Sequence, residues 1–563
     1  MRLRTLVCFA ALLVAPASVQ ARNALVQHHM IAAANPYASR AGLEMLRKGG
    51  SSVDAAIAAQ MVLTLVEPES SGIGGGTFVL LYDPKQNKVT SFDGRETAPA
   101  SATPGMFLDA SGAPRPHMDA IPGGLSVGVP GDIAVLELAH KKYGKLKWAG
   151  LFQPAIALAE RGFRVSRKMA EEIREEPQMA KMPDIRRYLY HADGTPLREG
   201  EILKNPELAQ TLRIIALGGA KAFYSGPIAQ AIVDKVQHAP VNRGGMTLAD
   251  LASYRAVERP PVCGAYRTYR LCSMGPPSSG GVAVLQILGM LEGFPSAQLA
   301  PNSLSEVHLV SQAERLAFAD RAQYLGDPDA IHVPVAGLLH RGYLRQRSLL
   351  IDSRRDMGSA APGTPPHAQT PYAPQRTPQL PGTSHLSVVD DAGEVVSMTT
   401  TIEYTFGSEM MAKGFFLNNQ LTDFSFEPTR DGKPVANAPA QGKRPMSAMS
   451  PTIVFGPDGK FKIAAGSPGG PMIITYVAEA LIGMLDGNLT PQQAAAQPHF
   501  ANPNGPTILE KDTAIDSLAP QLTAMGHNVV LHDLGSGLHI VERVPGGYIG
   551  GADPRRDGIA LGD

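Results

Sequence analysis

The stretch LPGTSHLSVVD, Leu380 to Asp390, joins a proline-rich run to an alternating, strand-like run at the bond between Gly382 and Thr383. An interior threonine hydroxyl is a poor nucleophile, and a freed N-terminus is one established way to activate it. If this bond is cut, Thr383 gains an α-amino group whose pKa, about 7.7 to 8.0 in model peptides, suits a general base at neutral pH. One residue then holds nucleophile and base. On this stretch alone, a threonine that merely starts a strand is the simpler interpretation.

A second candidate nucleophile is Ser126, because Gly124-Leu-Ser126-Val-Gly128 has the GxSxG spacing of the nucleophile elbow in serine hydrolases. A helix is also predicted shortly after it. However, the pattern is short, and chance matches are expected in a chain with 58 glycines. Turn-forming residues also stand where the elbow should continue. Ser126 is therefore the rival hypothesis, in which the chain is an unrelated serine hydrolase.

The glycine cluster Gly72 to Gly76 precedes a predicted strand and has no following Lys-Ser/Thr, so both common nucleotide-binding fingerprints fail. Close backbone packing or a turn is the plainer account of it. The histidines, including His28 and His29, show no HExxH or CxxC arrangement. We therefore expect neither a nucleotide nor a metal cofactor.

Two helices are predicted near the start of the chain. Asn35 is a candidate N-cap, Pro36 the first helical residue, and Gly49 lies just past the last turn. Ser52 can cap the next helix, over residues 53–66, which is apolar almost all round and therefore buried between layers. Further helical periods dominate residues 128–350.

Strands are predicted in two groups. The glycine cluster leads into one strand, and VTSFDGRETAP is its partner, ending in a loop at Arg95. After Thr383, two hairpins are predicted, with turns at Asp391-Ala392-Gly393 and at Asp458-Gly459. Helix runs around two groups of strands predict an α/β fold, a four-layer helix, sheet, sheet, helix sandwich.

Residues from about 353 to 381 carry many prolines and almost no large apolar side chains, so we expect an extended or mobile segment. At 563 residues the chain exceeds one ordinary domain, although two interwoven segments around one core also fit. The 51 basic residues balance 51 acidic ones, which gives no footprint for nucleic acid or a membrane surface. A neutral small molecule or a peptide is the expected partner.

The N-terminus has the pattern of a cleavable signal peptide. Arg2 and Arg4 precede a short apolar run, and the residues up to Ala21 suit cleavage after that position. The alternative is a membrane anchor, but the run is too short to span a bilayer comfortably. We expect an exported, soluble protein, in the periplasm or the medium of a bacterial-type cell.

Once Cys8 is removed with the signal peptide, Cys263 and Cys272 remain. If Arg267-Thr268 forms a two-residue hairpin turn, these cysteines lie directly opposite each other, with Cα atoms roughly 4.5 Å apart. That distance permits a disulfide in an oxidising compartment. Two small buried thiols are the alternative.

The stretch around Thr383 is one of several distinctive segments. In chain order they are AANPYASRAGLEMLRKGGSSVDAAIA, VEPESSGIGGGTF, GVPGD, PPSSGG, GTSHLSVVDDAGEVVSMTTTIEYTFGS, GFFLNNQLTDFS, KRPMSAMSPTIV, GSPGGPMIIT and ADPRRDG. Together they resemble the γ-glutamyltranspeptidase (γ-glutamyltransferase) family of N-terminal-nucleophile hydrolases over nearly the whole mature chain. This resemblance is far more specific than any single motif, and it outweighs the simpler interpretation of Thr383.

The resemblance implies a self-processing enzyme with the four-layer fold of N-terminal-nucleophile hydrolases. After removal of the signal peptide, residues 1–21, the precursor would cut itself before Thr383. The products would be a large subunit, 22–382, ending in the proline-rich segment 352–382, and a small catalytic subunit, 383–563. The two would stay together as a heterodimer without a cofactor.

The implied reaction begins when Thr383 attacks the γ-amide of a γ-glutamyl compound such as glutathione. Water, an amino acid or a peptide would then take the γ-glutamyl group from the threonine ester. The resemblance assigns Thr401 to a hydrogen bond with Thr383 that assists cleavage and catalysis. It assigns Gly469 and Gly470 to the oxyanion, which their backbone N–H groups can approach closely.

Other matches concern the head group of the substrate. Arg95 matches the arginine that holds the α-carboxylate, for which a planar guanidinium is well suited. Gln420 and Asp423 match the pair that binds the α-amino group. Ser447 matches the first of two serines that contact the α-carboxylate.

Two positions depart from the family pattern. Ala448 replaces the second serine, which removes a hydroxyl donor worth very roughly 0.5 to 1.5 kcal/mol. Glu403 stands where many members have asparagine. It could pair more strongly with the substrate ammonium, or raise the pKa of Asp423 and favour a different head group.

These departures leave two alternatives open beside the γ-glutamyl enzyme. The first is a glutaryl or cephalosporin-type acylase of the same fold, acting on glutaryl-type side chains, which lack the α-amino group. Glu403 and Ala448 favour it, whereas Arg95, Gln420 and Asp423 favour γ-glutamyl substrates. The second is a binding protein that never matures, which the retained threonines and double glycine argue against.

Overall fold

The computed structural model describes residues 25–369, 372–376, 380 and 382–563. The predicted signal peptide, including Cys8, lies outside the described residues. No helix in the described part combines the length and the apolar character that crossing a membrane requires.

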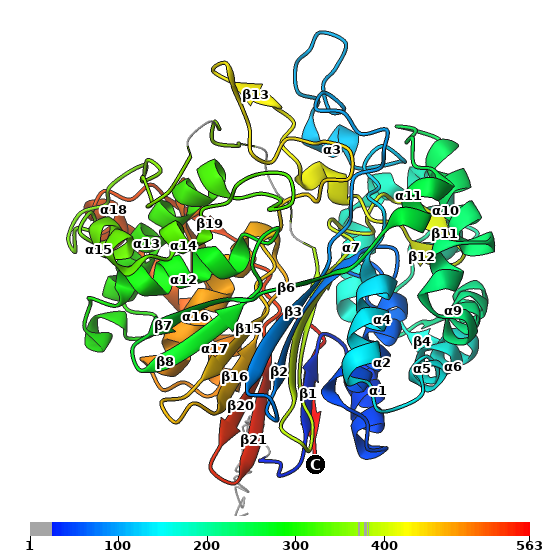
Figure 1. Ribbon diagram of the computed structural model, residues 1–563, viewed down its shortest axis with the longest axis horizontal. Helices are drawn as coiled ribbons and strands as arrows, with labels where there is room; N and C mark the ends of the chain where they lie inside the picture. Colours follow the sequence, from blue (N-terminus) through cyan, green and yellow to red (C-terminus); the bar gives the residue numbers. More distant parts are fainter. Residues whose placement is uncertain (1–24, 370–371, 377–379, 381) are drawn as a thin grey trace, which may run out of the picture.

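Two sheets face each other at the centre of the molecule (Figure 1). The first has seven strands, in the order β22 (Ile559–Gly562), β1 (Met30–Ala33), β9 (Ser384–Val389), β10 (Val395–Thr401), β2 (Gly76–Asp83), β3 (Lys88–Gly94) and β6 (Val257–Arg259). The second has six, in the order β21 (Gly547–Ala552), β20 (His539–Val544), β16 (Phe461–Ala465), β15 (Thr452–Phe455), β8 (Tyr269–Ser273) and β7 (Val262–Tyr266). Leu80 and Val389 of the first sheet share a buried apolar cluster with Ile453 and Val541 of the second, so the two inner faces pack together.

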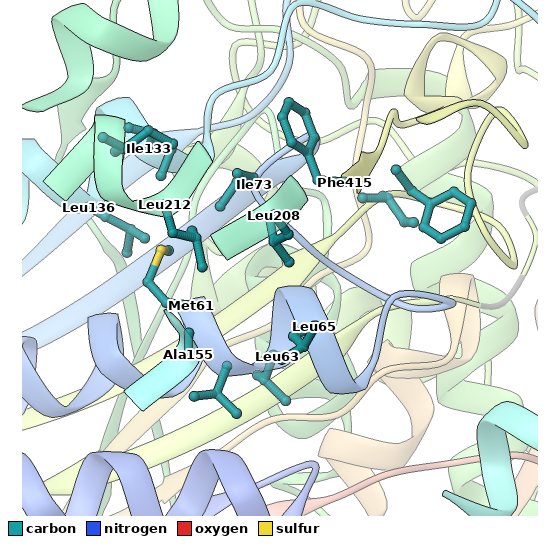
Figure 2. Close-up of a cluster of buried hydrophobic side chains, with 14 of the residues drawn as sticks. Met61, Leu63, Leu65, Ile73, Ile133, Leu136, Ala155, Leu208, Leu212 and Phe415 are labelled. Carbon is teal, nitrogen blue, oxygen red and sulfur yellow. The ribbon is translucent and has the colours of Figure 1, made fainter. Parts of the chain in front are cut away.

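Helices cover the outer face of each sheet (Figure 1). The layer over the first sheet includes α1 (Pro36–Arg47), α2 (Ser52–Val66) and α4 (Asp132–Tyr143), with α9 (Pro206–Tyr224) packed against α4. The layer over the second includes α12 (Gly280–Leu291), α13 (Leu304–Tyr324) and α16 (Ile473–Leu485). Figure 2 shows Met61 and Leu63 of α2 near Leu208 and Leu212 of α9, all in one buried cluster. The predicted four-layer α-β-β-α sandwich is confirmed.

Smaller elements complete the fold. The other helices are α3 (His117–Ala120), α5 (Trp148–Leu151), α6 (Gln153–Arg161), α7 (Arg167–Glu175), α8 (Pro183–Leu189), α10 (Pro227–Gln237), α11 (Leu248–Ser253), α14 (Val335–Leu338), α15 (Arg341–Ser348), α17 (Pro491–Ala496) and α18 (Ala519–Ala524). Short strands are β4 (Phe163–Arg164), β5 (Ile202–Leu203), β11 (Met411–Ala412), β12 (Phe415–Phe416), β13 (Thr429–Arg430), β14 (Lys433–Pro434), β17 (Phe500–Ala501), β18 (Thr507–Glu510) and β19 (Val529–His532).

Helix α1 begins as predicted, with the Asn35 side chain accepting a hydrogen bond from the backbone N–H of Tyr37. The prediction that Ser52 caps the second helix is wrong by one residue. Ser51 is the cap, because its hydroxyl accepts from the N–H of Asp54 while the Asp54 carboxylate accepts from the N–H of Ser51. This reciprocal pair satisfies two otherwise unpaired donors, which a cap at Ser52 could not do with Asp54.

The segments before and after Gly382 are interleaved in both sheets. In the first sheet, β9 and β10 lie between β1 and β2, and in the second sheet β8 pairs with β15. Backbone hydrogen bonds therefore join the two segments along several strands. A cut between Gly382 and Thr383 would leave these ladders intact.

The cysteine hairpin has the predicted register, with Cys263 opposite Cys272 and Cα atoms 4.1 Å apart. Of the two alternatives for these residues, the structure has the disulfide. The described part of the proline-rich segment contains no helix and no strand over residues 353–369. It is held against α13, where Gln312 donates to Asp356 at 2.6 Å and Asp320 accepts from the N–H of Gly363 at 2.8 Å.

Candidate active site

Thr383 and Thr401 lie side by side, because one immediately precedes β9 and the other ends its antiparallel neighbour β10. The Thr383 hydroxyl donates a hydrogen bond to the Thr401 hydroxyl at 3.1 Å. The same Thr401 oxygen accepts the N–H of Glu403 at 2.8 Å. The backbone N–H of Thr383 donates to the carbonyl of Ser70 at 3.2 Å. Both threonines are buried, so the hydroxyl of Thr383 is held by neighbours rather than by solvent.

The backbone is strained and tightly packed at the bond between Gly382 and Thr383. Thr383 has a φ of 105°, a region that a β-branched residue rarely adopts. Gly382 packs so closely that a Cβ there would come within 1.6 Å of the Glu403 carbonyl oxygen. Such strained conformations cost about 1–3 kcal/mol and cluster at functional sites. The position preceding Thr383 therefore requires glycine.

A backbone donor meets the carbonyl of this same bond. The N–H of Gly469 donates to the carbonyl oxygen of Gly382 at 3.3 Å. Gly469 has a φ of 131° and Gly470 one of 57°, and a Cβ on Gly469 would lie 2.6 Å from the ring of Tyr476. The Gly-Gly pair thus brings main chain to a point that a larger residue could not reach. A donor in this position can stabilise negative charge that develops on the carbonyl oxygen.

One small pocket collects most of the predicted site residues. They are Arg95, Thr383, Thr401, Glu403, Gln420, Asp423, Ser447 and Gly470. Gly469 lies beside this pocket, in the wall of a neighbouring cavity. Thr383 immediately precedes β9, Thr401 ends β10, and Glu403 follows β10. The loop after β3 supplies Arg95, a 3-10 helix after β12 supplies Gln420 and Asp423, the segment before β15 supplies Ser447, and the segment after β16 supplies Gly470.

Arg95 and Asp423 form a buried ion pair on the pocket wall. The Nη2 of Arg95 lies 2.5 Å from Oδ2 of Asp423, which also accepts from the Gln420 side chain at 2.7 Å. Carbonyl oxygens of Pro445 and Met446 accept further hydrogen bonds from Arg95, each at 3.1 Å. The guanidinium is therefore fixed in orientation, with part of its hydrogen-bonding capacity directed to protein groups.

Glu403 is buried in the pocket wall beside this ion pair. Asn419 donates to its Oε2, and its Oε1 has no hydrogen-bond partner among the described residues. Burial, reinforced by the charge of Asp423, raises the pKa of Glu403 well above its usual value. The ionised form is thus disfavoured unless a cation enters the pocket. Asn419 was not singled out in the sequence, although it stands beside Gln420 in the quoted NNQLTDFS segment.

Ser447 is held by residues that sequence reasoning did not assign. Its carbonyl accepts from the backbone N–H of Ser279 at 2.8 Å and from the Ser279 hydroxyl at 2.5 Å. Its own hydroxyl accepts from the N–H of Met449 at 3.1 Å. Ser279 belongs to the PPSSGG segment that contributes to the family resemblance, but the sequence did not indicate that it would bind the Ser447 carbonyl. Ala448 lines the pocket next to Ser447 and presents a methyl group.

Ser126 is not brought to this pocket. Its buried hydroxyl donates to the carbonyl oxygens of Ile121 at 2.6 Å and Gly123 at 3.1 Å. A nucleophilic serine would need a base at that position, so the hydroxyl has a structural role. The glycine cluster is used for close packing, as predicted, since a Cβ on Gly75 would lie 2.0 Å from the Thr401 carbonyl oxygen.

Comparisons with known proteins agree with this arrangement. The family model described as gamma-glutamyltranspeptidase matches residues 38–563. The glutathione hydrolase proenzyme of Bacillus subtilis (strain 168) is 37% identical over 547 residues, which cover 95% of this chain and 91% of that protein. The acylase ACY 1 proenzyme of Pseudomonas sp. (strain SE83) is 33% identical over 535 residues, with 93% and 91% covered. The crystal structure of a cephalosporin acylase from Bacillus halodurans superposes with a TM-score of 0.84 at 27% identity, covering 99% of each chain.

Proposed function

The chain belongs to the gamma-glutamyltranspeptidase family, and we propose that it cuts itself before Thr383 and then hydrolyses or transfers γ-glutamyl groups, those of glutathione included. One observation carries the proposal. The candidate nucleophile Thr383 is bonded to Thr401, while the Gly469 N–H meets the carbonyl of the strained bond that would be cut. Nucleophile, oxyanion donor and scissile carbonyl are thus adjacent before any cleavage.

Self-cleavage follows from this geometry in two steps. The Thr383 hydroxyl oxygen attacks the carbonyl carbon of Gly382, and the oxyanion receives the Gly469 N–H. The C–N bond breaks as the hydroxyl proton passes to nitrogen, which leaves an ester between the two residues. Water then hydrolyses the ester, and the products are a carboxylate on Gly382 and a free α-amino group on Thr383.

The freed α-amino group supplies the base for turnover. It takes the hydroxyl proton as Thr383 attacks the γ-amide carbon of the donor, and it returns a proton to the leaving amine. Arg95 and Ser447 would bind the donor α-carboxylate, and Gln420 and Asp423 its α-amino group. The resulting γ-glutamyl ester passes to water or to an amino acid or peptide.

The interleaved sheets support a two-subunit product. Residues 22–382 and 383–563 would separate only if the strand pairs β1–β9, β10–β2 and β15–β8 opened. We therefore propose that the subunits stay together as a heterodimer. The disulfide, which persists in oxidising compartments, and the signal-like N-terminus together support export to the periplasm or medium.

A glutaryl or cephalosporin acylase is the second candidate. It is favoured by Glu403, whose raised pKa disfavours the charged form that an α-ammonium group would prefer. The retained ion pair of Arg95 and Asp423, with Gln420 beside it, supports the γ-glutamyl reading instead. The two substrates differ only in the α-amino group, so a direct comparison separates the candidates.

The test measures processing and substrate choice on the same preparations. Wild type and Thr383→Ala are compared by denaturing gel and intact mass, and then with γ-glutamyl and glutaryl p-nitroanilides. We expect two fragments and faster γ-glutamyl cleavage from the wild type, and one inactive, uncut chain from Thr383→Ala. Faster glutaryl cleavage would establish the acylase. One uncut chain from both proteins would leave Thr383 without its base and overturn the proposal.

A further inference from the structure

A second cavity, of about 430 Å³, adjoins the candidate active site. We call it the side cavity. Its wall includes Gly382 and Gly469, which are the scissile carbonyl and its backbone donor. The wall also carries Glu69, Lys168 and Arg556, none of which lines the pocket that holds Thr383. The cavity therefore reaches the reacting bond from a different side.

Glu69 is a buried acid that lacks partners. Glu69 lines the cavity and is only 2% exposed. Neither of its carboxyl oxygens has a hydrogen-bond partner among the described residues. Burial and the neighbouring Glu67 raise the pKa of Glu69 well above its usual value. A buried carboxyl without partners is costly, and a donor arriving from the cavity would relieve that cost.

Cations stand on the same wall. Lys168 pairs with Glu172 on α7, and burial, aided by the charge of Arg556, lowers the pKa of Lys168 to about 8. Arg556 donates to the Ser70 hydroxyl at 3.4 Å, and the Ser70 carbonyl accepts the N–H of Thr383. Carboxylates and cations together in one cavity match a ligand that carries both an amino and a carboxylate group.

The position of the cavity indicates at which step of the reaction such a ligand would bind. The acyl carbon in the tetrahedral intermediate has four substituents: the Thr383 oxygen, the oxyanion, the donor chain and an amine. The donor chain runs into the pocket of Arg95, and the oxyanion meets Gly469. The amine must leave or arrive along the remaining direction, and the side cavity borders both Gly382 and Gly469.

We propose that the side cavity binds the acceptor of the transfer reaction, an amino acid or short peptide, with its amino group at Glu69 and its carboxylate at Lys168 and Arg556. This inference rests on the proposed transferase function. In the step it serves, the acceptor nitrogen attacks the γ-glutamyl ester and forms an amide bond. The bond between the acyl carbon and the Thr383 oxygen breaks, and the amine proton reaches that oxygen through the Thr383 α-amino group.

The experiment uses the self-cleaved protein with γ-glutamyl p-nitroanilide as the donor. Two acceptors are compared: glycylglycine, and glycinamide, which has an amino group but no carboxylate. For Lys168→Met we expect the KM of glycylglycine to rise at least tenfold and that of glycinamide less than twofold. For Glu69→Gln the KM of both acceptors should rise. This rise should be larger than any change in the KM of the donor, measured for hydrolysis in the absence of an acceptor. Lys48→Met, which removes an exposed lysine paired with Glu44 on α1, is the matched control.

The outcomes separate this inference from the proposed function. A wild-type protein that does not cleave the donor fails as a γ-glutamyl enzyme. A wild type that hydrolyses the donor but transfers to neither acceptor overturns the acceptor site alone. The acceptor site is also overturned if Lys168→Met leaves the preference for glycylglycine over glycinamide unchanged. If Glu69→Gln does not fold, the Lys168→Met comparison still decides.

Discussion

The hydroxyl of Thr383 donates a hydrogen bond to the hydroxyl of Thr401 at 3.1 Å, across the hairpin formed by β9 and β10. The register, with Ser384 opposite Thr400, brings the two residues together at the open end of the hairpin. Because Thr401 also accepts the N–H of Glu403, its oxygen links the candidate nucleophile to the pocket wall.

Replacing Thr401 should slow self-cleavage. Thr401→Val removes the acceptor of two hydrogen bonds, each worth about 0.5–1.5 kcal/mol, so cleavage should slow about 5- to 150-fold. Thr401→Ser keeps the hydroxyl and should cleave within about threefold of the wild-type rate. A gel time course of freshly refolded precursor gives both rates. Equal rates for Thr401→Val and the wild type would show that this hydrogen bond does not assist cleavage.

Glu403 should make stability depend on pH. The folded chain holds the Glu403 proton more tightly than the unfolded chain does, because the pKa is raised well above 4.5 in the fold. Between 4.5 and that raised pKa the folded state binds more protons, so stability falls as pH rises. Glu403→Gln cannot titrate, so it should lose this pH-dependent contribution to the free energy of unfolding. The contribution amounts to at most about 1.4 kcal/mol per pH unit.

The measurement compares thermal unfolding of Thr383→Ala with and without Glu403→Gln, since both proteins remain single chains. The Tm of the double variant minus that of the single one should grow from about pH 5 to about pH 8. Glu44→Gln, at an exposed position on α1, is the control for a glutamate-to-glutamine change outside the pocket. A constant Tm difference across this range would mean that Glu403 is ionised in the folded chain.

Ala448→Ser should strengthen donor binding. The new hydroxyl would stand beside Ser447 in the pocket wall, where it can donate to the substrate carboxylate. One such hydrogen bond is worth about 0.5–1.5 kcal/mol, so the donor KM should fall about 2- to 10-fold. Both γ-glutamyl and glutaryl anilides carry this carboxylate, so both should improve. Ala448→Gly adds no donor, and a comparable fall in its KM would contradict this explanation.

Loss of the disulfide should lower stability without altering turnover. Cys263 and Cys272 close a loop with a sequence separation of 9, for which chain entropy predicts about 2–3 kcal/mol. Neither residue lines the pocket of Thr383. Cys263→Ala/Cys272→Ala should therefore unfold at lower denaturant concentration and keep the wild-type kcat. Unfolding of the wild type under reducing conditions provides a check with both side chains in place.

Local patterns allowed the sequence to determine much of the scaffold. Alternating strands around short turns predicted the β9–β10 hairpin, and the turn at Arg267-Thr268 predicted the register of the cysteines. These signals are reliable because neighbours along the chain set both periodicity and turn geometry. Where competing local signals were one residue apart, as at Ser51 and Ser52, the side-chain contacts decided between them.

Relationships between distant residues needed the tertiary structure. Only the packing of the layers brings Arg95 to Asp423, 328 positions away, and the N–H of Gly469 to the carbonyl of Gly382. The tertiary structure also distinguishes the two candidate nucleophiles. The Ser126 hydroxyl donates to a backbone carbonyl away from the pocket, whereas Thr383 lines the pocket. Residue types and motifs thus determined which groups could react. The close packing of two sheets between helices decided which of them meet, because contacts between distant segments depend on the whole core rather than on local sequence.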